Sequence, residues 1–321
     1  MNVLITSAGQ RVSLVRAFQK ELTKRYPTAK VFTVDMQPEL SAACNVSDRY
    51  FKVKRVTDPE YINELIALCI EQNIEMVVPT IDTELKVLSL YKSRFAEQGI
   101  HLIVSDPSFV DKCRDKRLIN QFFIEHGVDI PRAVDKNNPV FPLFIKPYDG
   151  SLSVDTFLIR SQAELTAYHL SNEKFLFMEY MDKLEYDEYT VDMYYGKDHQ
   201  VKCIIPRKRI FVRGGEINKG LTCKNGIVAF LHERLSRIEG AIGCLTLQLF
   251  MHKINKRMAG IEINPRFGGV YPLSYAAGGN YPAWLIEEYF EGKDISYFED
   301  WENNLLMLRY DDEVLVHDYK A

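Results

Sequence analysis

The sequence is poor in the features that mark several large classes of protein. Six cysteines are spread over 321 residues without a C-x-x-C pair, so neither a zinc site nor a disulfide framework follows from their spacing. No apolar run approaches the roughly 20 residues that a membrane helix needs. The N-terminus also lacks a basic segment followed by a long apolar stretch, the pattern of a secretory signal peptide. We therefore expect a soluble cytoplasmic protein that does not bind membranes.

Glycine is scarce in the first hundred residues, and neither sign of charge dominates the chain. Only Gly9 occurs between residues 1 and 98, so the G-x-G-x-x-G loop of a dinucleotide-binding domain is missing. A nicotinamide-dependent dehydrogenase is therefore disfavoured, although Asp35 follows the second predicted strand as it would in such a domain. Lysine and arginine number 40 against 44 acidic residues. This balance argues against a nucleic-acid-binding protein.

What the first hundred residues do contain is an alternation of strand and helix patterns. Short apolar runs occur at residues 1–6, 31–34, 76–79 and 101–104. The segments between them carry apolar residues at helical spacing, as in Arg11 to Arg25. This rhythm predicts a parallel sheet with helices on its faces. Ligands bind beyond the carboxyl ends of such strands, where Ser7 to Gln10 and Thr80 to Asp82 lie.

The rhythm changes near residue 110. One helix is predicted over residues 111–126, and strand patterns dominate from residue 141 onwards. Two antiparallel strands are expected at Cys244 to Met251 and at Arg257 to Asn264, joined by a polar turn. The change of pattern indicates a domain boundary near residue 110.

The strongest chemical signal is the string GIEINPRFGG at residues 260–269. Glu262 and Asn264 are two positions apart on a predicted strand, so their side chains point to the same face. A carboxylate beside an amide oxygen is a site of hard oxygen ligands that suits Mg²⁺. Gln248 on the preceding strand adds an oxygen, and Arg266 past the strand end suits a phosphate. For the E-x-N spacing alone, an exposed strand face that ends in a proline turn is the alternative.

Two weaker signals precede this string. Lys146 ends the apolar strand FPLFIKP and is followed by a turn with Gly and Ser, which suits phosphate because a buried lysine needs an anion. Further along, an apolar strand leads into Glu179, Tyr180 and Met181. Adenine could lie against that strand, and Glu188 on the next strand could accept ribose hydroxyls. Taken singly, each segment is more typical of an ordinary strand end or an acidic hairpin.

In their order along the chain, these segments resemble the ATP-grasp superfamily, most closely its carbamoyl-phosphate-synthase-like and carboxylate–amine ligase branches. The order is a lysine in an Asp-Lys helix, Lys-Pro with a turn, two glutamates around a turn, then Gln and Glu-x-Asn-Pro-Arg. The resemblance implies an α/β fold: a Rossmann-like domain over residues 1–110 precedes an α+β ATP-grasp module. That module would comprise a small subdomain over residues 111–185 with the phosphate loop and a large subdomain over residues 186–321 with the metal site.

The resemblance also implies which residues bind the nucleotide. Lys116 and Lys146 match the two lysines that contact the phosphates of ATP, and Ser153 lies in the phosphate loop. Glu188 matches the carboxylate that binds the ribose. The segment that reads adenine matches Glu179, Tyr180 and Met181.

The metal ligands and the catalytic groups are implied in the same way. Gln248, Glu262 and Asn264 match the ligands of Mg²⁺, with Glu262 bridging two ions and Mn²⁺ as a substitute. Arg266 matches the arginine that steadies the γ-phosphoryl group, so Arg266 and Lys146 are the expected catalytic residues. The implied reaction is attack by a small-molecule carboxylate on the γ-phosphate, after which an amine captures the acyl phosphate and a C–N bond forms. A homodimer is compatible with the resemblance, and nothing in the sequence decides the oligomeric state.

The phosphate loop departs from the family pattern. It is usually glycine-rich around a serine, but here only Gly150 and Ser153 match, and Leu152 and Asp155 stand where glycine is common. Side chains there crowd the backbone, and a carboxylate near phosphates is repulsive. The departure favours a second hypothesis, an ATP-binding regulatory or structural protein whose ATP-grasp site is inactive.

A row of arginines suggests where the carboxylate substrate binds. On a strand, Arg207, Arg209, Phe211 and Arg213 would share one face. In the resembling ligases a basic strand in this region borders the acceptor pocket. We predict that Arg207 or Arg209 holds the substrate carboxylate through paired hydrogen bonds. The alternative is a solvated edge strand, whose charges discourage pairing with other sheets.

Overall fold

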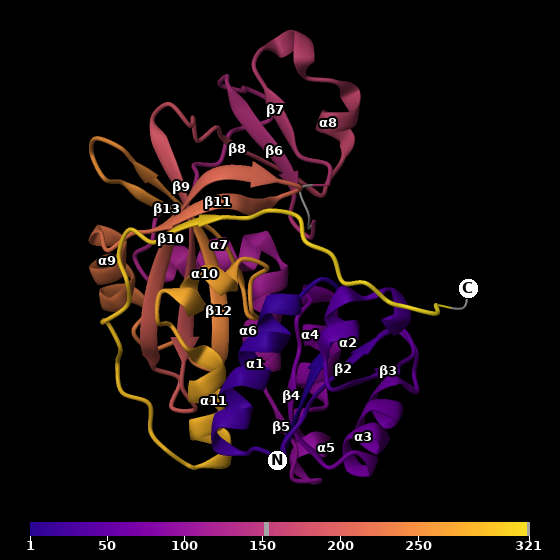
Figure 1. Cartoon of the computed structure of the whole chain (residues 1–321). Helices are drawn as coiled ribbons and strands as arrows, with labels where there is room; N and C mark the ends of the chain where they lie inside the picture. The colour runs from indigo at the N-terminus through magenta and orange to yellow at the C-terminus, as the bar shows by residue number, and fades with distance from the viewer. Residues whose placement is uncertain (151–153, 320–321) are drawn as a thin grey trace.

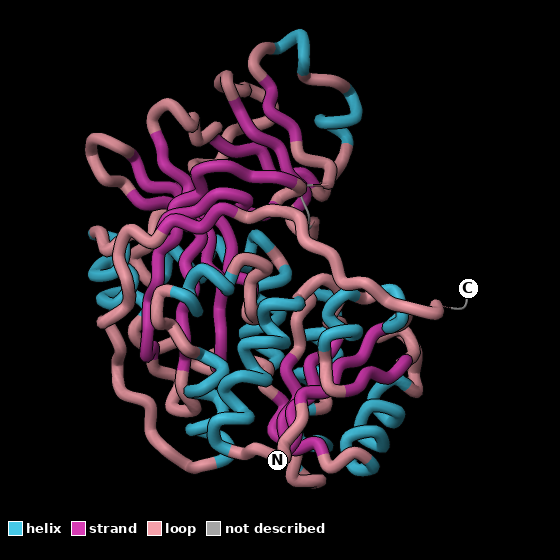
Figure 2. The backbone as a smooth tube through the Cα atoms, viewed as in Figure 1, coloured by secondary structure: helices cyan, strands magenta, loops and turns pink. Residues whose placement is uncertain are grey.

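The computed structural model describes residues 1–150 and 154–319, whose strands form three separate sheets (Figures 1 and 2). The first sheet has the strand order β3-β2-β1-β4-β5 and is parallel throughout, as the alternation of strand and helix predicts. Its strands are β1 (Asn2–Thr6), β2 (Val31–Asp35), β3 (Arg49–Lys52), β4 (Ile74–Val78) and β5 (His101–Leu102). Its helices are α1 (Val12–Arg25), α2 (Ala42–Val46), α3 (Tyr61–Glu71), α4 (Asp82–Leu90) and α5 (Lys92–Ala96), with a 3₁₀ turn at Pro38–Leu40.

The second unit is a small antiparallel sheet in the order β7-β6-β8, which forms the upper lobe of Figure 1. Its strands are β6 (Leu143–Pro147), β7 (Phe157–Ile159) and β8 (Phe175–Glu179), accompanied by α8 (Ala167–Ser171) and a 3₁₀ turn at Gln162–Glu164. Two helices lead into it, α6 (Pro107–Arg114) and α7 (Lys116–Glu125). The boundary expected at residue 110 therefore falls inside α6, which packs on both α4 and α7.

The third unit is a six-stranded antiparallel sheet in the order β13-β12-β9-β10-β11-β14. Its strands are β9 (Tyr186–Tyr195), β10 (Val201–Arg213), β11 (Glu216–Thr222), β12 (Gly243–His252), β13 (Met258–Asn264) and β14 (Leu306–Leu308). The accompanying helices are α9 (Gly226–Leu235), α10 (Tyr271–Ala276) and α11 (Tyr281–Phe290). A long loop runs from α11 around the molecule to β14, and the chain then extends across to the first domain (Figure 2).

One apolar core joins the first domain to the six-stranded sheet. Val3, Ile5 and Phe18 of the first domain share a buried cluster with Ile205 and Tyr281 of the large unit. The α1 helix lies against α10 and α11. Because burial of apolar surface is the main favourable term in folding, we expect these two units to fold and to move together.

The prediction of a single helix over residues 111–126 is wrong, because the helical conformation is interrupted at Asp115, between α6 and α7. Asp115 adopts an extended conformation and its carboxylate accepts a hydrogen bond from the backbone N–H of Arg117, as a helix N-cap does. Apolar spacing runs through both helices and hides the break. The break makes Lys116, one of the predicted nucleotide-binding residues, the first residue of α7.

None of the helices in the described part of the chain combines the length and the apolar character that a membrane crossing needs.

Candidate active site

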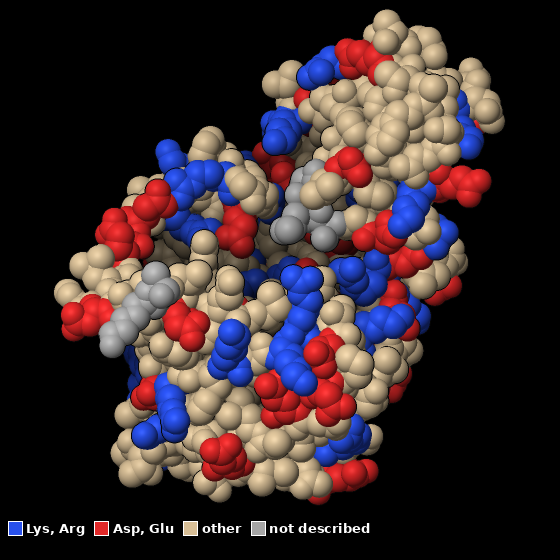
Figure 3. Space-filling view, turned by 90° about the vertical axis from the view of Figure 1, so that its right-hand side faces the viewer, with Lys and Arg blue, Asp and Glu red and all other residues tan. Residues whose placement is uncertain are grey.

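A cavity of about 860 Å³ lies where the three units meet, and all three contribute to its walls. In the space-filling view it is a hollow beneath the upper lobe, with Lys and Arg side chains along its lower rim (Figure 3). Thirteen residues were predicted to bind the nucleotide, the metal or the substrate or to act in catalysis, and twelve of them, from Lys116 to Arg266, line this cavity. The remaining one, Ser153, lies outside the described residues.

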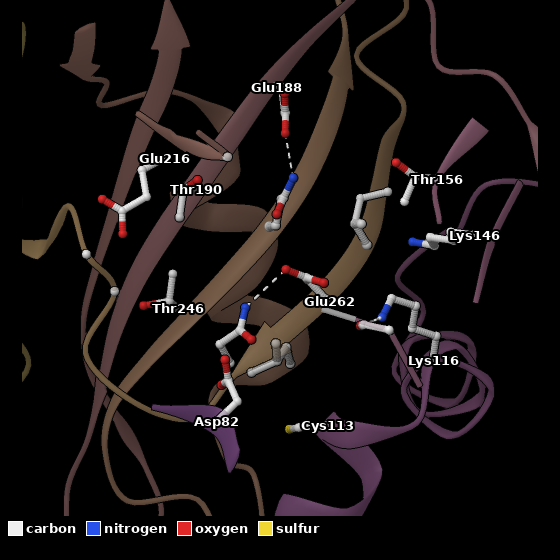
Figure 4. Close-up of a pocket in the computed structure, with 18 of the residues that line it drawn as sticks. Asp82, Cys113, Lys116, Lys146, Thr156, Glu188, Thr190, Glu216, Thr246 and Glu262 are labelled. Atoms are coloured by element: carbon white, nitrogen blue, oxygen red, sulfur yellow. Dashed lines mark hydrogen bonds between the residues drawn. The ribbon is translucent and has the colours of Figure 1, made fainter. Parts of the chain in front are cut away.

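The register of the large sheet explains why the predicted metal ligands face the cavity together. Gln248 of β12 pairs with Glu262 of β13, and Thr246 pairs with Asn264 two positions away. The Asn264 amide donates a hydrogen bond to Glu262 Oε1 at 3.1 Å, and the Gln248 amide donates one to Glu188 (Figure 4). The predicted site thus supplies one carboxylate and two amide oxygens.

This donor set fits Mg²⁺ better than a soft metal. In the part of the chain that the structure describes, no group of three or more His, Cys, Asp or Glu residues could hold a metal ion. Mg²⁺ is usually held by one or two carboxylates, with phosphate and water as its other ligands. The site therefore fits an Mg²⁺ ion that is bound to a nucleoside triphosphate, with Glu262, Asn264 and Gln248 as its protein ligands.

Two lysines face Glu262 from the opposite wall (Figure 4). Lys116 Nζ donates a hydrogen bond to the carbonyl oxygen of Gly150 at 2.5 Å, and its backbone N–H bonds the carbonyl oxygen of Tyr148. Lys146 is only 8 % exposed, and burial lowers its pKa to about 8, with Lys116 acting in the same direction and Glu262 opposing it. A pair of largely desolvated ammonium groups is costly unless an anion compensates it.

The residues predicted to bind the nucleoside also line the cavity. The Glu179 carboxylate forms ion pairs with Arg257 at 2.8 Å and with Arg132 at 3.3 Å. The backbone N–H of Glu179 also donates a hydrogen bond to the carbonyl oxygen of Arg132. These contacts fix the end of β8, from which Tyr180 and Met181 line the wall. Glu188 faces the cavity from β9, within 3.0 Å of the Arg209 Nε atom.

Arg266 is held by the first domain. Its Nε and Nη2 atoms donate to the two carboxylate oxygens of Asp82 at 3.0 and 2.6 Å, the bidentate geometry that guanidinium groups favour. Asp82 begins α4 at the carboxyl edge of the parallel sheet, where the sequence predicted ligand contacts. Arg266 also donates to the carbonyl of Phe267 at 3.2 Å, so it stands at the cavity wall in a fixed orientation.

Arg207 and Arg209 line the cavity, but both have internal partners. Arg207 is fully buried and donates to the buried carboxylate of Asp192 at 2.7 Å and to the carbonyl of Val270. Arg209 pairs with Glu188 and donates to the Thr190 hydroxyl and the Gly215 carbonyl. That Arg207 or Arg209 binds a substrate carboxylate stays a prediction. Binding would require the arginine to replace its internal hydrogen bonds with bonds to the substrate.

The predicted common face of the arginine row is wrong beyond Arg209. The register of β10 against β11 shifts between Arg209 and Val212, as at a β-bulge. Val212 therefore lines the cavity, whereas Phe211 and Arg213 are exposed. Strict alternation along a strand cannot anticipate a bulge.

Several residues that line the cavity were not among the predicted site residues. Arg11, Asp82 and Cys113 line the cavity, and so does Glu216 of β11, a strand that was not predicted. Thr80 to Asp82 were expected at a ligand-binding edge of the first sheet, but the pairing of Asp82 with Arg266 was not predicted. Nothing in the local pattern around Arg11, which immediately precedes α1, distinguishes it from the basic residues of that helix.

Comparisons with known proteins agree with this geometry. Residues 171–311 match the family model described as "ATP-grasp in the biosynthetic pathway with Ter operon", and residues 3–103 match the one described as "PylC-like, N-terminal domain". The chain carries an ATP-grasp domain. The resemblance predicted from the ordered motifs is confirmed, and so is the fold class. A search of the curated proteins found no match for the chain.

Several solved structures share the fold of the whole chain. Biotin carboxylase of Campylobacter jejuni has a TM-score of 0.72 at 14% identity, covering 95% of this chain and 74% of its own. N5-carboxyaminoimidazole synthetase of Staphylococcus aureus complexed with ADP has a TM-score of 0.68 at 14% identity, covering 96% of this chain and 79% of its own. L-amino acid ligase of Bacillus licheniformis has a TM-score of 0.66 at 16% identity, covering 90% of this chain and 74% of its own. At these identities the likeness shows the fold alone.

Proposed function

We propose that the protein is an ATP- and Mg²⁺-dependent ligase that activates a small-molecule carboxylate as an acyl phosphate and joins it to an amine. One observation carries the proposal. The described side chains that the ATP-grasp resemblance assigns to phosphates, nucleoside and metal come from two units of the fold, yet they line one cavity. The neighbouring folds named as a carboxylase, a synthetase and an amino acid ligase support the same class of reaction.

The residues divide the work of phosphoryl transfer. Lys116 and Lys146 bind phosphate oxygens, and Arg266 steadies the γ-phosphoryl group as negative charge develops on it. Glu262, Asn264 and Gln248 would hold Mg²⁺, which supplies charge neutralisation at the phosphates when it is bound. A substrate carboxylate oxygen attacks the γ-phosphorus and ADP leaves. The neutral amine then attacks the acyl carbon, inorganic phosphate departs, and the nitrogen loses its proton to form the amide.

Finer points belong to the same proposal. Two Mg²⁺ ions bridged by Glu262, with Mn²⁺ as a substitute, follow from the resemblance. A related fold, the biotin carboxylase domain of 2-oxoglutarate carboxylase from Hydrogenobacter thermophilus, is described as a dimer in complex with MgADP, which supports Mg²⁺ and a homodimer here. The cytoplasmic location also stays a prediction.

A paired substrate screen tests the proposal. ADP formation should be measured with MgATP and candidate carboxylates and amines, supplied singly and in pairs, for the parent and for Lys146→Ala. The proposal expects ADP formation that depends on a pair and is lost in the variant. ATP binding without ADP formation for any pair would instead favour the inactive, regulatory ATP site.

A further inference from the structure

Two guanidinium groups converge on one backbone oxygen at the junction of the domains. Arg11 Nη1 and Arg266 Nη1 each donate a hydrogen bond to the carbonyl oxygen of Phe267 at 3.2 Å. The two nitrogens are therefore no more than about 6.4 Å apart, the sum of the two bonds. Like charges this close repel each other unless an anion compensates them.

Among the described residues, only one of the two guanidinium groups is paired directly with a carboxylate. Asp82 pairs with Arg266 through both carboxylate oxygens. Among the residues that the structure describes, no carboxylate lies within 4.0 Å of the Arg11 guanidinium, whose second Nη donates to the carbonyl of Thr80 at 3.0 Å. Carbonyl oxygens accept the hydrogen bonds of two N–H groups, but they do not neutralise the positive charge of the guanidinium. Three of the five guanidinium N–H donors of Arg11 stay available.

The electrostatics of Arg11 agree with this account. Its pKa is lowered to about 10, first by burial and then by the neighbouring charge of Arg266, against the opposing influence of Glu216 and Asp82. A guanidinium with a pKa that low sits in a place that needs an anion. The positive end of α1, which begins at Val12, adds to that need.

The loop before Arg11 is held rigidly. Ser7 and Gly9 both have φ near +49°, a conformation that L side chains such as that of Ser7 rarely adopt. The Thr80 hydroxyl donates to the carbonyls of Thr6 and Ser7, and the Ser7 hydroxyl donates to the buried carboxylate of Glu84. Strained backbone that its surroundings over-determine is a common property of ligand sites.

The other arginines of this part of the cavity are already neutralised. Arg207 forms an ion pair with Asp192, and Arg209 forms one with Glu188. Arg114 also lines the cavity without a carboxylate partner among the described residues, but its charge acts on Lys116, at the phosphate end. Arg11 is thus the guanidinium beside Arg266 that, among the described residues, has no directly paired carboxylate.

We propose that Arg11, from the first domain, binds the carboxylate of the substrate that is phosphorylated and holds it beside Arg266. The identification of this carboxylate as a substrate rests on the proposed ligase function. The planar guanidinium offers a carboxylate two parallel hydrogen bonds, and Arg266 next to it steadies the phosphoryl group that the carboxylate attacks. The first domain would thereby complete the active site rather than only support it.

Ligand binding without turnover tests the assignment. The parent is saturated with Mg²⁺ and a non-hydrolysable ATP analogue, and a panel of carboxylates, from acetate to dicarboxylates and amino acids, is titrated by calorimetry and thermal shift. We expect at least one to bind, and Arg11→Gln to weaken that binding by about tenfold or more, the usual loss for a charge-assisted pair. Arg11→Lys should recover only part of the affinity, because it keeps the charge but not the planar geometry.

Matched controls make each outcome decisive. Arg16 is exposed one turn further along α1, so Arg16→Gln should bind the carboxylate as the parent does. Affinity of all variants for the ATP analogue should stay within about twofold, which shows that the site is folded. Equal carboxylate binding by Arg11→Gln and the parent would overturn the assignment, and so would failure of every carboxylate to bind the parent.

The two proposals fail in different experiments. Carboxylate binding that depends on Arg11, without ADP formation from any pair, would leave the Arg11 site standing and remove the ligase function. Pair-dependent ADP formation with an unchanged carboxylate KM in Arg11→Gln would do the reverse.

Discussion

At the scale of single residues, the account depends most on Glu262. Its carboxylate is the only acid among the three predicted metal ligands, and it faces both lysines across the cavity. Replacing it with glutamine removes the charge that Mg²⁺ requires but keeps a similar shape.

We predict that Glu262→Gln abolishes pair-dependent ADP formation while the thermal midpoint of unfolding changes little. Glu97→Gln, at an exposed position of the first domain, serves as the control and should match the parent. Full activity of Glu262→Gln would contradict the metal assignment.

Lys146 gives a prediction about pH. Its pKa is about 8 in the free protein and 10.5 is the ordinary value, so above pH 8 the free protein increasingly carries a neutral amine. Phosphate oxygens favour the ammonium form, and binding of MgATP should therefore take up a proton near pH 8. We expect the affinity for MgATP to fall as the pH rises above about 8.

Calorimetric titrations in buffers of different ionisation enthalpy measure that proton uptake. Lys146→Arg should lose it, because arginine stays charged throughout this range. Lys136→Arg, at an exposed position before β6, should keep it. Equal proton uptake by Lys146→Arg and the parent would place the titrating group elsewhere.

At the scale of elements, the segment predicted to be the phosphate loop departs from the pattern of the ATP-grasp resemblance. Asp155 is exposed, has φ of +53° and is not among the cavity residues, although Val154 and Thr156 on either side of it are. A left-handed conformation explains why glycine is common at this position.

We predict that Asp155→Gly tightens MgATP binding modestly, by a few-fold at low salt, because it removes a negative charge near the phosphates. Asp155→Asn separates the causes, since asparagine tolerates positive φ and removes only the charge. A gain shared by both variants indicates charge, and a gain confined to glycine indicates backbone freedom. Unchanged or weaker binding in both would mean that Asp155 faces away from the nucleotide.

The elements also show what the sequence can predict and what it cannot. Apolar strand patterns place the β12–β13 hairpin within one residue of its predicted bounds, with the expected polar turn between the strands. The break before α7 and the bulge in β10 were missed, because both depend on local backbone geometry that apolar spacing does not encode. β11, with its sequence EINKGLT, was missed because it has few apolar residues, and pairing with β10 and β14 makes it a strand.

The same limit applies to the site. Glu262 and Asn264 could be placed together because two residues on one strand share a face. The contacts of Arg266 could not be predicted, because its partner Asp82 is 184 positions away in the chain and belongs to another domain. Long-range pairs of this kind need the fold.

At the scale of the whole molecule, the Asp82–Arg266 pair links the first domain to the ATP-grasp domain. The two side chains are 20 % and 16 % exposed, so the pair is screened less than a surface pair. Removing one partner leaves a poorly solvated charge behind, in a wall of the active site.

We predict that Asp82→Asn destabilises the protein by roughly 1–3 kcal/mol and lowers kcat more than it changes the KM for ATP, because Arg266 loses its fixed orientation. Asp111→Asn breaks the pair with Lys86 of α4, in which both side chains are about half exposed, and should cost well under about 1 kcal/mol. Chemical denaturation and steady-state kinetics measure both effects. If Asp82→Asn behaves like Asp111→Asn, the first domain does not act through Arg266.

The most direct test of the proposed chemistry follows an oxygen atom. A carboxylate labelled with ¹⁸O in both oxygens is supplied with its amine and MgATP, and the released inorganic phosphate is analysed by mass spectrometry. Attack of the carboxylate on the γ-phosphate, followed by capture of the acyl group, transfers one labelled oxygen to phosphate. We predict one ¹⁸O atom in each phosphate released during ligation; unlabelled phosphate accompanying amide formation would contradict an acyl phosphate intermediate.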